Sequence, residues 1–183
     1  MEFIDLKTIY TIMHVIGAVI GAGGAYLSDA IFFASTKDRT INKTEFKFMK
    51  LGSIFVWSGL ALLFISGLLL FSTNPAGYME SSKFLVKMFI VFIIFVNGIF
   101  FHVFHFPKIY RHINHHYPSS DEFMRNKKLL MISGVISMTS WTFALILGGL
   151  RFIPITFTEA LFVYVIFELV SIFIALRFFK KAF

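Results

Sequence analysis

Five long runs of apolar residues divide the chain, and polar or charged stretches separate them. The runs lie at about residues 8–34, 51–71, 84–106, 129–150 and 157–179. Each can cross a bilayer as a helix, which takes about 20 apolar residues. A membrane-spanning backbone has to satisfy its own hydrogen bonds, so helices are expected. The pattern predicts an all-α integral membrane bundle of five transmembrane helices, with residues 1–183 as one domain.

The first run carries small and polar residues on one helical face. A histidine, three glycines and a serine recur there at intervals of three and four: His14, Gly17, Gly21, Gly24 and Ser28. Glycines let another helix or a flat ligand approach the backbone closely. The histidine offers a nitrogen that can coordinate a metal or move a proton. Helix packing alone, with His14 hydrogen-bonded to a neighbouring helix, explains the same face.

Basic residues are unevenly distributed among the connections. Most of the 17 Lys and Arg residues lie between the first and second runs, between the third and fourth runs, and in the C-terminal tail. Cytoplasmic segments of membrane proteins carry such an excess. We therefore predict the N-terminus outside and the C-terminus in the cytoplasm. The net charge of +7 then reflects topology, and no nucleic-acid partner is expected.

Composition agrees with a membrane location and narrows the chemistry. Hydrophobic residues make up 57% of the chain, with 26 Phe, whereas soluble domains have about 45–50% apolar residues. The chain has no cysteine. This excludes disulfides, thiolate metal sites, iron–sulfur clusters and covalently attached c-type haem, but not b-type haem.

Ionisable residues gather toward the predicted cytoplasmic side. Asp29 lies near the inner end of the first run, and His102 and His105 lie near the inner end of the third. If these two helices are neighbours, the three side chains could share a metal ion or a proton site. The connection that follows holds three more histidines without a recognised ligand spacing: His112, His115 and His116.

Glu168 lies near the middle of the fifth run, where an unpaired acid is costly. Polar residues of the third and fourth runs lie at similar depth: Asn97, Thr139, Ser140 and Thr142. Hydrogen bonds among these groups would tie the helices together. A proton path through Glu168 and Asn97 is the alternative.

Two segments resemble a known family. His14-Val-Ile-Gly17 with its small-residue run, and Phe84-Leu-Val-Lys87-Met88, are similar to HemJ-type protoporphyrinogen oxidases, and the first also to copper-resistance-D-like membrane proteins. The resemblance covers roughly the first three helices. It implies a bacterial inner-membrane protein that binds haem b, with His14 and Lys87 as the functional pair. Asp29 stands where the family has an arginine, which favours a changed reaction.

A haem b group would fit the first run as follows. Haem iron commonly takes a histidine ligand, for which we expect His14. Gly17, Gly21 and Gly24 would leave a slot for the macrocycle. Lys87, the expected catalytic residue, or Met88 would supply the second axial ligand. A second metal ion or haem could lie at the Asp29, His102 and His105 group.

Three functions follow from these features. The first is a haem-b redox protein or haem-dependent oxidoreductase, acting by electron transfer or on a lipophilic substrate such as a porphyrinogen or quinone. The second is a metal-cation transporter or permease that uses the intramembrane Asp, His and Glu residues. The third is an accessory subunit of a membrane complex. Lipid is the common partner, and a homo-oligomer or a larger membrane complex is compatible with all three.

Overall fold

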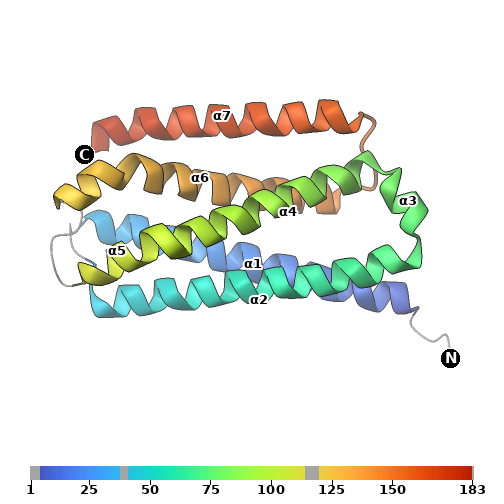
Figure 1. Ribbon diagram of the computed structural model, residues 1–183, viewed down its shortest axis with the longest axis horizontal. Helices are drawn as coiled ribbons and strands as arrows, with labels where there is room; N and C mark the ends of the chain where they lie inside the picture. Colours follow the sequence, from blue (N-terminus) through green and yellow to red (C-terminus); the bar gives the residue numbers. More distant parts are fainter. Residues whose placement is uncertain (1–4, 38–40, 114–119, 183) are drawn as a thin grey trace.

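The computed structural model describes residues 5–37, 41–113 and 120–182, and its regular elements are all helical within those ranges (Figure 1). In chain order they are α1 (Leu6–Lys37), α2 (Lys43–Thr73), α3 (Pro75–Met79), α4 (Ser82–Phe100), the π-helix η1 (Phe101–His105), α5 (Phe106–Arg111), α6 (Asp121–Gly149) and α7 (Phe157–Ala182). Five segments are long and apolar enough to cross a membrane: Leu6–Ser35, Lys43–Thr73, Ser82–Arg111, Asp121–Gly149 and Phe157–Phe178. The predicted five-helix, multi-pass membrane architecture is confirmed.

Two helices begin earlier than the apolar runs predict. Helix α2 begins at Lys43 instead of about residue 51, and α6 begins at Asp121 instead of about residue 129. The Asn42 side chain accepts hydrogen bonds from the backbone N–H groups of Thr44 and Glu45, and the Glu45 carboxylate accepts one from the Asn42 N–H. A helix begins where such a cap satisfies its free N–H groups, even when its first turns are charged.

The helices lie side by side, with α1 and α2 along one edge, α4 and α6 in the middle and α7 along the other edge (Figure 1). Helix α1 makes its most extensive contacts with α2 and packs next on α6, and α7 packs on α6 and α4. The first turn of α1 and the last turn of α7 lie at opposite ends of the bundle. We call the end with the first turn of α1 the α1-start end.

Glycines allow α1 and α2 to pack backbone against backbone. A Cβ atom added to Gly24 would lie 2.6 Å from the carbonyl oxygen of Gly52, and one added to Gly17 would lie 3.1 Å from that of Gly59. On the same face of α1, a Cβ added to Gly21 would overlap the indole ring of Trp141 from α6. The α1 face is therefore filled by α2 and by Trp141, as the helix-packing interpretation predicts. It leaves no slot for a flat macrocycle, which corrects that part of the haem expectation.

The third span is interrupted near one end by the π-helix. Residues 82–111 form one continuous span in which α4 passes into η1 and then α5. In a π-helix each hydrogen bond reaches five residues along instead of four, so side chains turn by a different amount per residue. Two residues three apart therefore do not share a face there as they would in an α-helix. The π-helix therefore changes the directions in which the His102 and His105 side chains point relative to each other.

Candidate functional site around His14 and Lys87

The His14 side chain is held by a serine on the neighbouring helix. Its Nδ1 lies 3.0 Å from the hydroxyl oxygen of Ser66 in α2, and Ser66 is fully buried. The same hydroxyl oxygen lies 2.5 Å from the carbonyl oxygen of Leu62. Two oxygens at that distance need a proton between them, and only the Ser66 hydroxyl has one, so Ser66 donates to Leu62. The Ser66 oxygen then accepts a hydrogen bond from the Nδ1–H of His14.

This arrangement fixes which nitrogen of His14 is free. With the proton on Nδ1, the neutral ring presents its lone pair at Nε2. Within the described ranges, the hydrogen bond of this ring with a defined partner atom is the one to Ser66, and the backbone of Leu63 also lies within hydrogen-bonding reach of the ring. A Cβ added to Gly67 would still lie 3.6 Å from the ring, so Gly67 keeps the space beside the imidazole open. A histidine whose other ring nitrogen donates a hydrogen bond to a second residue is oriented as metal-ligating histidines are.

Lys87 reaches the same end of the bundle from α4. Its Nζ lies 3.7 Å from the position of a Cβ added to Gly148 in α6, and it is within electrostatic range of His14. Lys83, one turn earlier, donates a hydrogen bond to the carbonyl oxygen of Leu150. The two residues that the family resemblance pairs therefore come from α1 and α4 and lie at the same end of the bundle, with the His14 ring against α2 and Lys87 beside Gly148 of α6.

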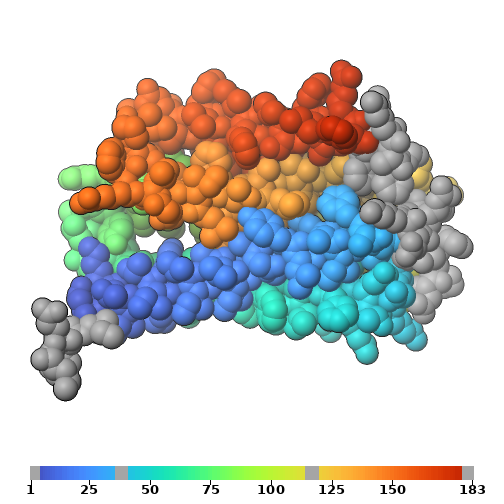
Figure 2. All heavy atoms as spheres, turned by 180° about the vertical axis from the view of Figure 1, so that it is seen from behind, coloured from blue at the N-terminus to red at the C-terminus, as the bar shows by residue number. Residues whose placement is uncertain are grey.

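An opening lies at this end between α1 and α6. Close contacts between these helices join Gly21 to Trp141 and Tyr26 to Thr142, further from the α1-start end. Figure 2 shows a gap between the dark-blue first half of α1 and the orange last turns of α6. The two helices thus diverge toward the end that carries His14 and Gly148.

Met88 does not join this group. Its side chain is 51% exposed, which places it on the outer surface of α4. Successive residues of a helix point in different directions, and Lys87 is the one turned toward α6. Met88 as an axial ligand beside His14 therefore stays a prediction, and the geometry gives it no support.

Asp29 and the two histidines of η1 are not brought together into a site. Helix α1 packs mainly on α2 and next on α6, so the first and third spans are not the close neighbours that the sequence interpretation assumed. His102 is exposed and stacks on Phe106, whereas His105 is 1% exposed with neither ring nitrogen hydrogen-bonded. The π-helix separates the two rings. Among the described residues, no three His, Cys, Asp or Glu side chains are placed to hold a metal ion.

Glu168 joins α7 to α6 through hydroxyl groups. Its Oε1 accepts hydrogen bonds from Thr139 at 2.6 Å and Ser140 at 3.0 Å, and the Ser140 and Tyr164 hydroxyls lie 2.8 Å apart. The geometry is that of the helix-tying interpretation. Tyr164 was not singled out from the sequence, although its position four residues before Glu168 places both on one helical face.

Asn97 belongs to a different helix contact. Its amide nitrogen donates to the carbonyl oxygen of Ser133, and its amide oxygen accepts from the Ser133 hydroxyl, both at 2.9 Å. These bonds join α4 to α6 and occupy the polar atoms that a path to Glu168 would use. In the described part of the chain, no hydrogen bond connects Asn97 to Glu168.

The histidine-rich connection is only partly described. His112 caps α5, with its Nδ1 2.9 Å from the carbonyl oxygen of Lys108 and 3.6 Å from Glu122. His115 and His116 lie outside the described residues. In the described part of this connection, His112 forms the hydrogen-bonded end of a helix.

The fold and these contacts define a multi-pass helical membrane protein with a hydrogen-bonded histidine near one end of the bundle. Comparison of the chain with known protein families, with curated proteins and with solved structures finds no match. The function therefore has to be inferred from the site itself.

Proposed function

We propose that the protein is a haem-b-binding redox protein of the bacterial inner membrane and that Nε2 of His14 is the axial ligand of the iron. The observation that carries this proposal is the Ser66 hydrogen bond, which places the proton on Nδ1 and leaves Nε2 free. Histidine is a common haem ligand, and a second hydrogen bond of this kind orients such ligands. One-electron transfer is the chemistry that haem supplies when bound.

The surrounding residues fit this role in part. The opening between α1 and α6 supports access from the lipid, which suits a lipophilic partner such as a quinone or a porphyrinogen. The Lys87 ammonium, in electrostatic range of His14, would bind an acidic group of a cofactor or substrate. The glycine face of α1 and Met88 take no part in the proposal.

The test is the absorption spectrum of the purified protein, oxidised and then reduced, after expression with ample haem. We expect haem bands that His14→Ala abolishes or strongly shifts, with the variant still in the membrane fraction. His102→Ala and His112→Ala are matched controls and should keep the bands. A colourless wild-type protein, or unchanged bands in His14→Ala, would overturn the assignment.

A second variant examines the hydrogen bond that carries the proposal. Ser66→Ala removes the acceptor for Nδ1–H and should weaken haem affinity by about 10- to 100-fold. Ser72→Ala, on the same helix but exposed and bonded only to a carbonyl of its own helix, should bind as the wild type does. Equal haem affinity in Ser66→Ala and Ser72→Ala would contradict the role given to Ser66.

The proposal also includes the orientation of the protein in the membrane. The basic residues support an N-terminus outside and a C-terminus in the cytoplasm, which places His14 toward the outer face. Reporter fusions after Asn42 and in the connection between α5 and α6 should both read cytoplasmic. A periplasmic signal at either position would reverse the orientation.

A further inference from the structure

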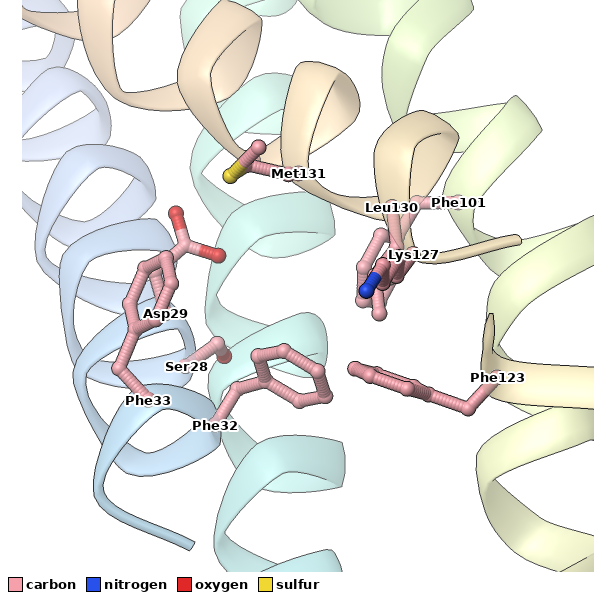
Figure 3. A pocket seen from close by; sticks show the side chains of 10 residues that line it. Ser28, Asp29, Phe32, Phe33, Phe101, Phe123, Lys127, Leu130 and Met131 are labelled. Carbon is pink, nitrogen blue, oxygen red and sulfur yellow. The ribbon is translucent and has the colours of Figure 1, made fainter. Parts of the chain in front are cut away.

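A cavity surrounds Asp29, far along α1 from His14. It consists of two neighbouring pockets that both have Asp29 in their lining, and the larger part, about 60 Å³, lies among α1, α2, α4 and α6. Figure 3 shows the smaller part, where the Asp29 carboxyl group faces a space bordered by aromatic rings. The larger volume holds a few water molecules or one ion, and it is too small for an organic cofactor.

Asp29 is an acid without a partner in this cavity. Its Oδ2 is buried and has no hydrogen bond, and its Oδ1 lies 3.8 Å from the position of a Cβ added to Gly134 in α6. Within the described ranges, no basic side chain forms an ion pair with it. A carboxylate at membrane depth is costly unless another charge or several donors compensate it.

The larger part of the cavity offers further oxygen atoms. Four serines line it from three helices: Ser28 of α1, Ser53 of α2, and Ser133 and Ser137 of α6. The Ser133 hydroxyl already donates a hydrogen bond to Asn97, so Ser28, Ser53 and Ser137 are the serines considered as ligands. Ser28 makes only a long hydrogen bond, 3.4 Å, to the carbonyl oxygen of Met49. Carboxylate and hydroxyl oxygens are hard ligands, which suit alkali and alkaline-earth cations and not soft transition metals.

We propose that Asp29 and these serines bind a small monovalent cation, with Na⁺ as the expected ion. One carboxylate and one monovalent cation leave the buried site neutral. A divalent ion would remain uncompensated, because Asp29 is the one acid among the described residues that line the two pockets. This site differs from the predicted transition-metal site, since neither His102 nor His105 contributes a ligand.

Lys127 places a positive charge beside the site. It lines the smaller part of the cavity from α6, and its Nζ lies 3.6 Å from the sulfur of Met124 in its own helix. In Figure 3 its amine and the Asp29 carboxyl group border the same space from opposite walls. A fixed positive charge at this position weakens cation binding, so Lys127 is expected to limit the affinity.

The direct test is binding of radioactive ²²Na⁺ to the purified full-length protein in detergent micelles. We expect one Na⁺ per chain, and Asp29→Asn should weaken binding by more than about 10-fold. Glu168→Gln, which alters another buried acid of the same bundle, is the matched control and should bind as the wild type does. Absent Na⁺ binding in the wild type, or unchanged binding in Asp29→Asn, would overturn the proposal and leave water as the occupant.

Two further variants keep the test decisive if Asp29→Asn fails to fold. Ser137→Ala removes one hydroxyl ligand and should lower Na⁺ affinity, whereas Lys127→Gln should raise it. In the wild type, Na⁺ at 100-fold excess over Kd should raise Tm by about 5 °C relative to choline at equal ionic strength. If Lys127→Gln instead destabilises the protein as Asp29→Asn does, without any effect of Na⁺, then Asp29 pairs with Lys127 and the cation site is refuted.

Discussion

Replacing Gly59 of α2 with alanine tests how closely α1 and α2 pack. A Cβ atom at this position would overlap the backbone nitrogen of Gly21 and would lie 2.5 Å from its Cα and 2.7 Å from the carbonyl oxygen of Gly17. All three neighbours are backbone atoms, so no side-chain rotation can make room. Helix α1 would have to move away from α2, and the contacts along the whole interface would loosen.

The size of the effect follows from two opposing terms. Overpacking a tightly packed interior costs about 1–3 kcal/mol, and three backbone neighbours on α1 favour the upper end of that range. Alanine in place of glycine stabilises a helix by up to about 1 kcal/mol. Gly59→Ala should therefore lower the free energy of unfolding by about 2 kcal/mol. Gly23→Ala is the matched control, because a Cβ there meets nothing within 4 Å.

The assay is unfolding in detergent, followed by the fluorescence of Trp57 and Trp141. Both tryptophans lie within the bundle, so their emission reports separation of the helices. Gly23→Ala should be as stable as the wild type or slightly more stable, while Gly59→Ala unfolds earlier. Equal stability of the two variants would refute the close backbone contact between α1 and α2.

Two other substitutions have expected outcomes. Glu168→Ala leaves the Thr139 and Ser140 hydroxyls without their shared acceptor and should destabilise the protein by about 1–2 kcal/mol in thermal unfolding, whereas Glu168→Gln keeps an acceptor oxygen and should cost less. A loss as large in Glu168→Gln would contradict this account. Asn42→Ala removes the cap of α2 and should cost about 1 kcal/mol, with faster hydrogen exchange at Thr44 and Glu45. Lys43→Ala, in the same turn, should leave that exchange unchanged.

The five spans could be predicted from the sequence because membrane crossing depends on a local property, the length of an apolar run. The helix starts could not be placed by the same criterion. Charged first turns follow the caps at Asn42 and Ser120, and these turns lie outside the apolar runs. The cap of α2 can itself be recognised in the sequence, since Asn42 and Glu45 have the spacing of a capping box. The capping box therefore marks the start of α2 in the sequence, although the apolar run begins later.

The choice of helix neighbours could not be predicted from the sequence. A face with Gly17, Gly21 and Gly24 indicates close approach, but the sequence does not say whether a ligand or a helix approaches. The structure shows that the partner is α2, because its Gly52 and Gly59 lie against the glycines of α1. The π-helix is a second limit, because its altered turn is not encoded in apolar periodicity. It separates His102 from His105, which α-helical spacing places together.

The two proposed sites lie on one helix and can be tested independently. His14 and Asp29 are separated by about 22 Å along α1 at 1.5 Å per residue. The segment between them is the part of α1 that packs against the α2 backbone and Trp141. Because that segment is held on two sides, a substitution at one site should leave the other in place. We expect His14→Ala to lose the haem bands and keep Na⁺ binding, and Asp29→Asn to lose Na⁺ binding and keep the haem bands. That result would mean that one rigid helix supports two separate functions.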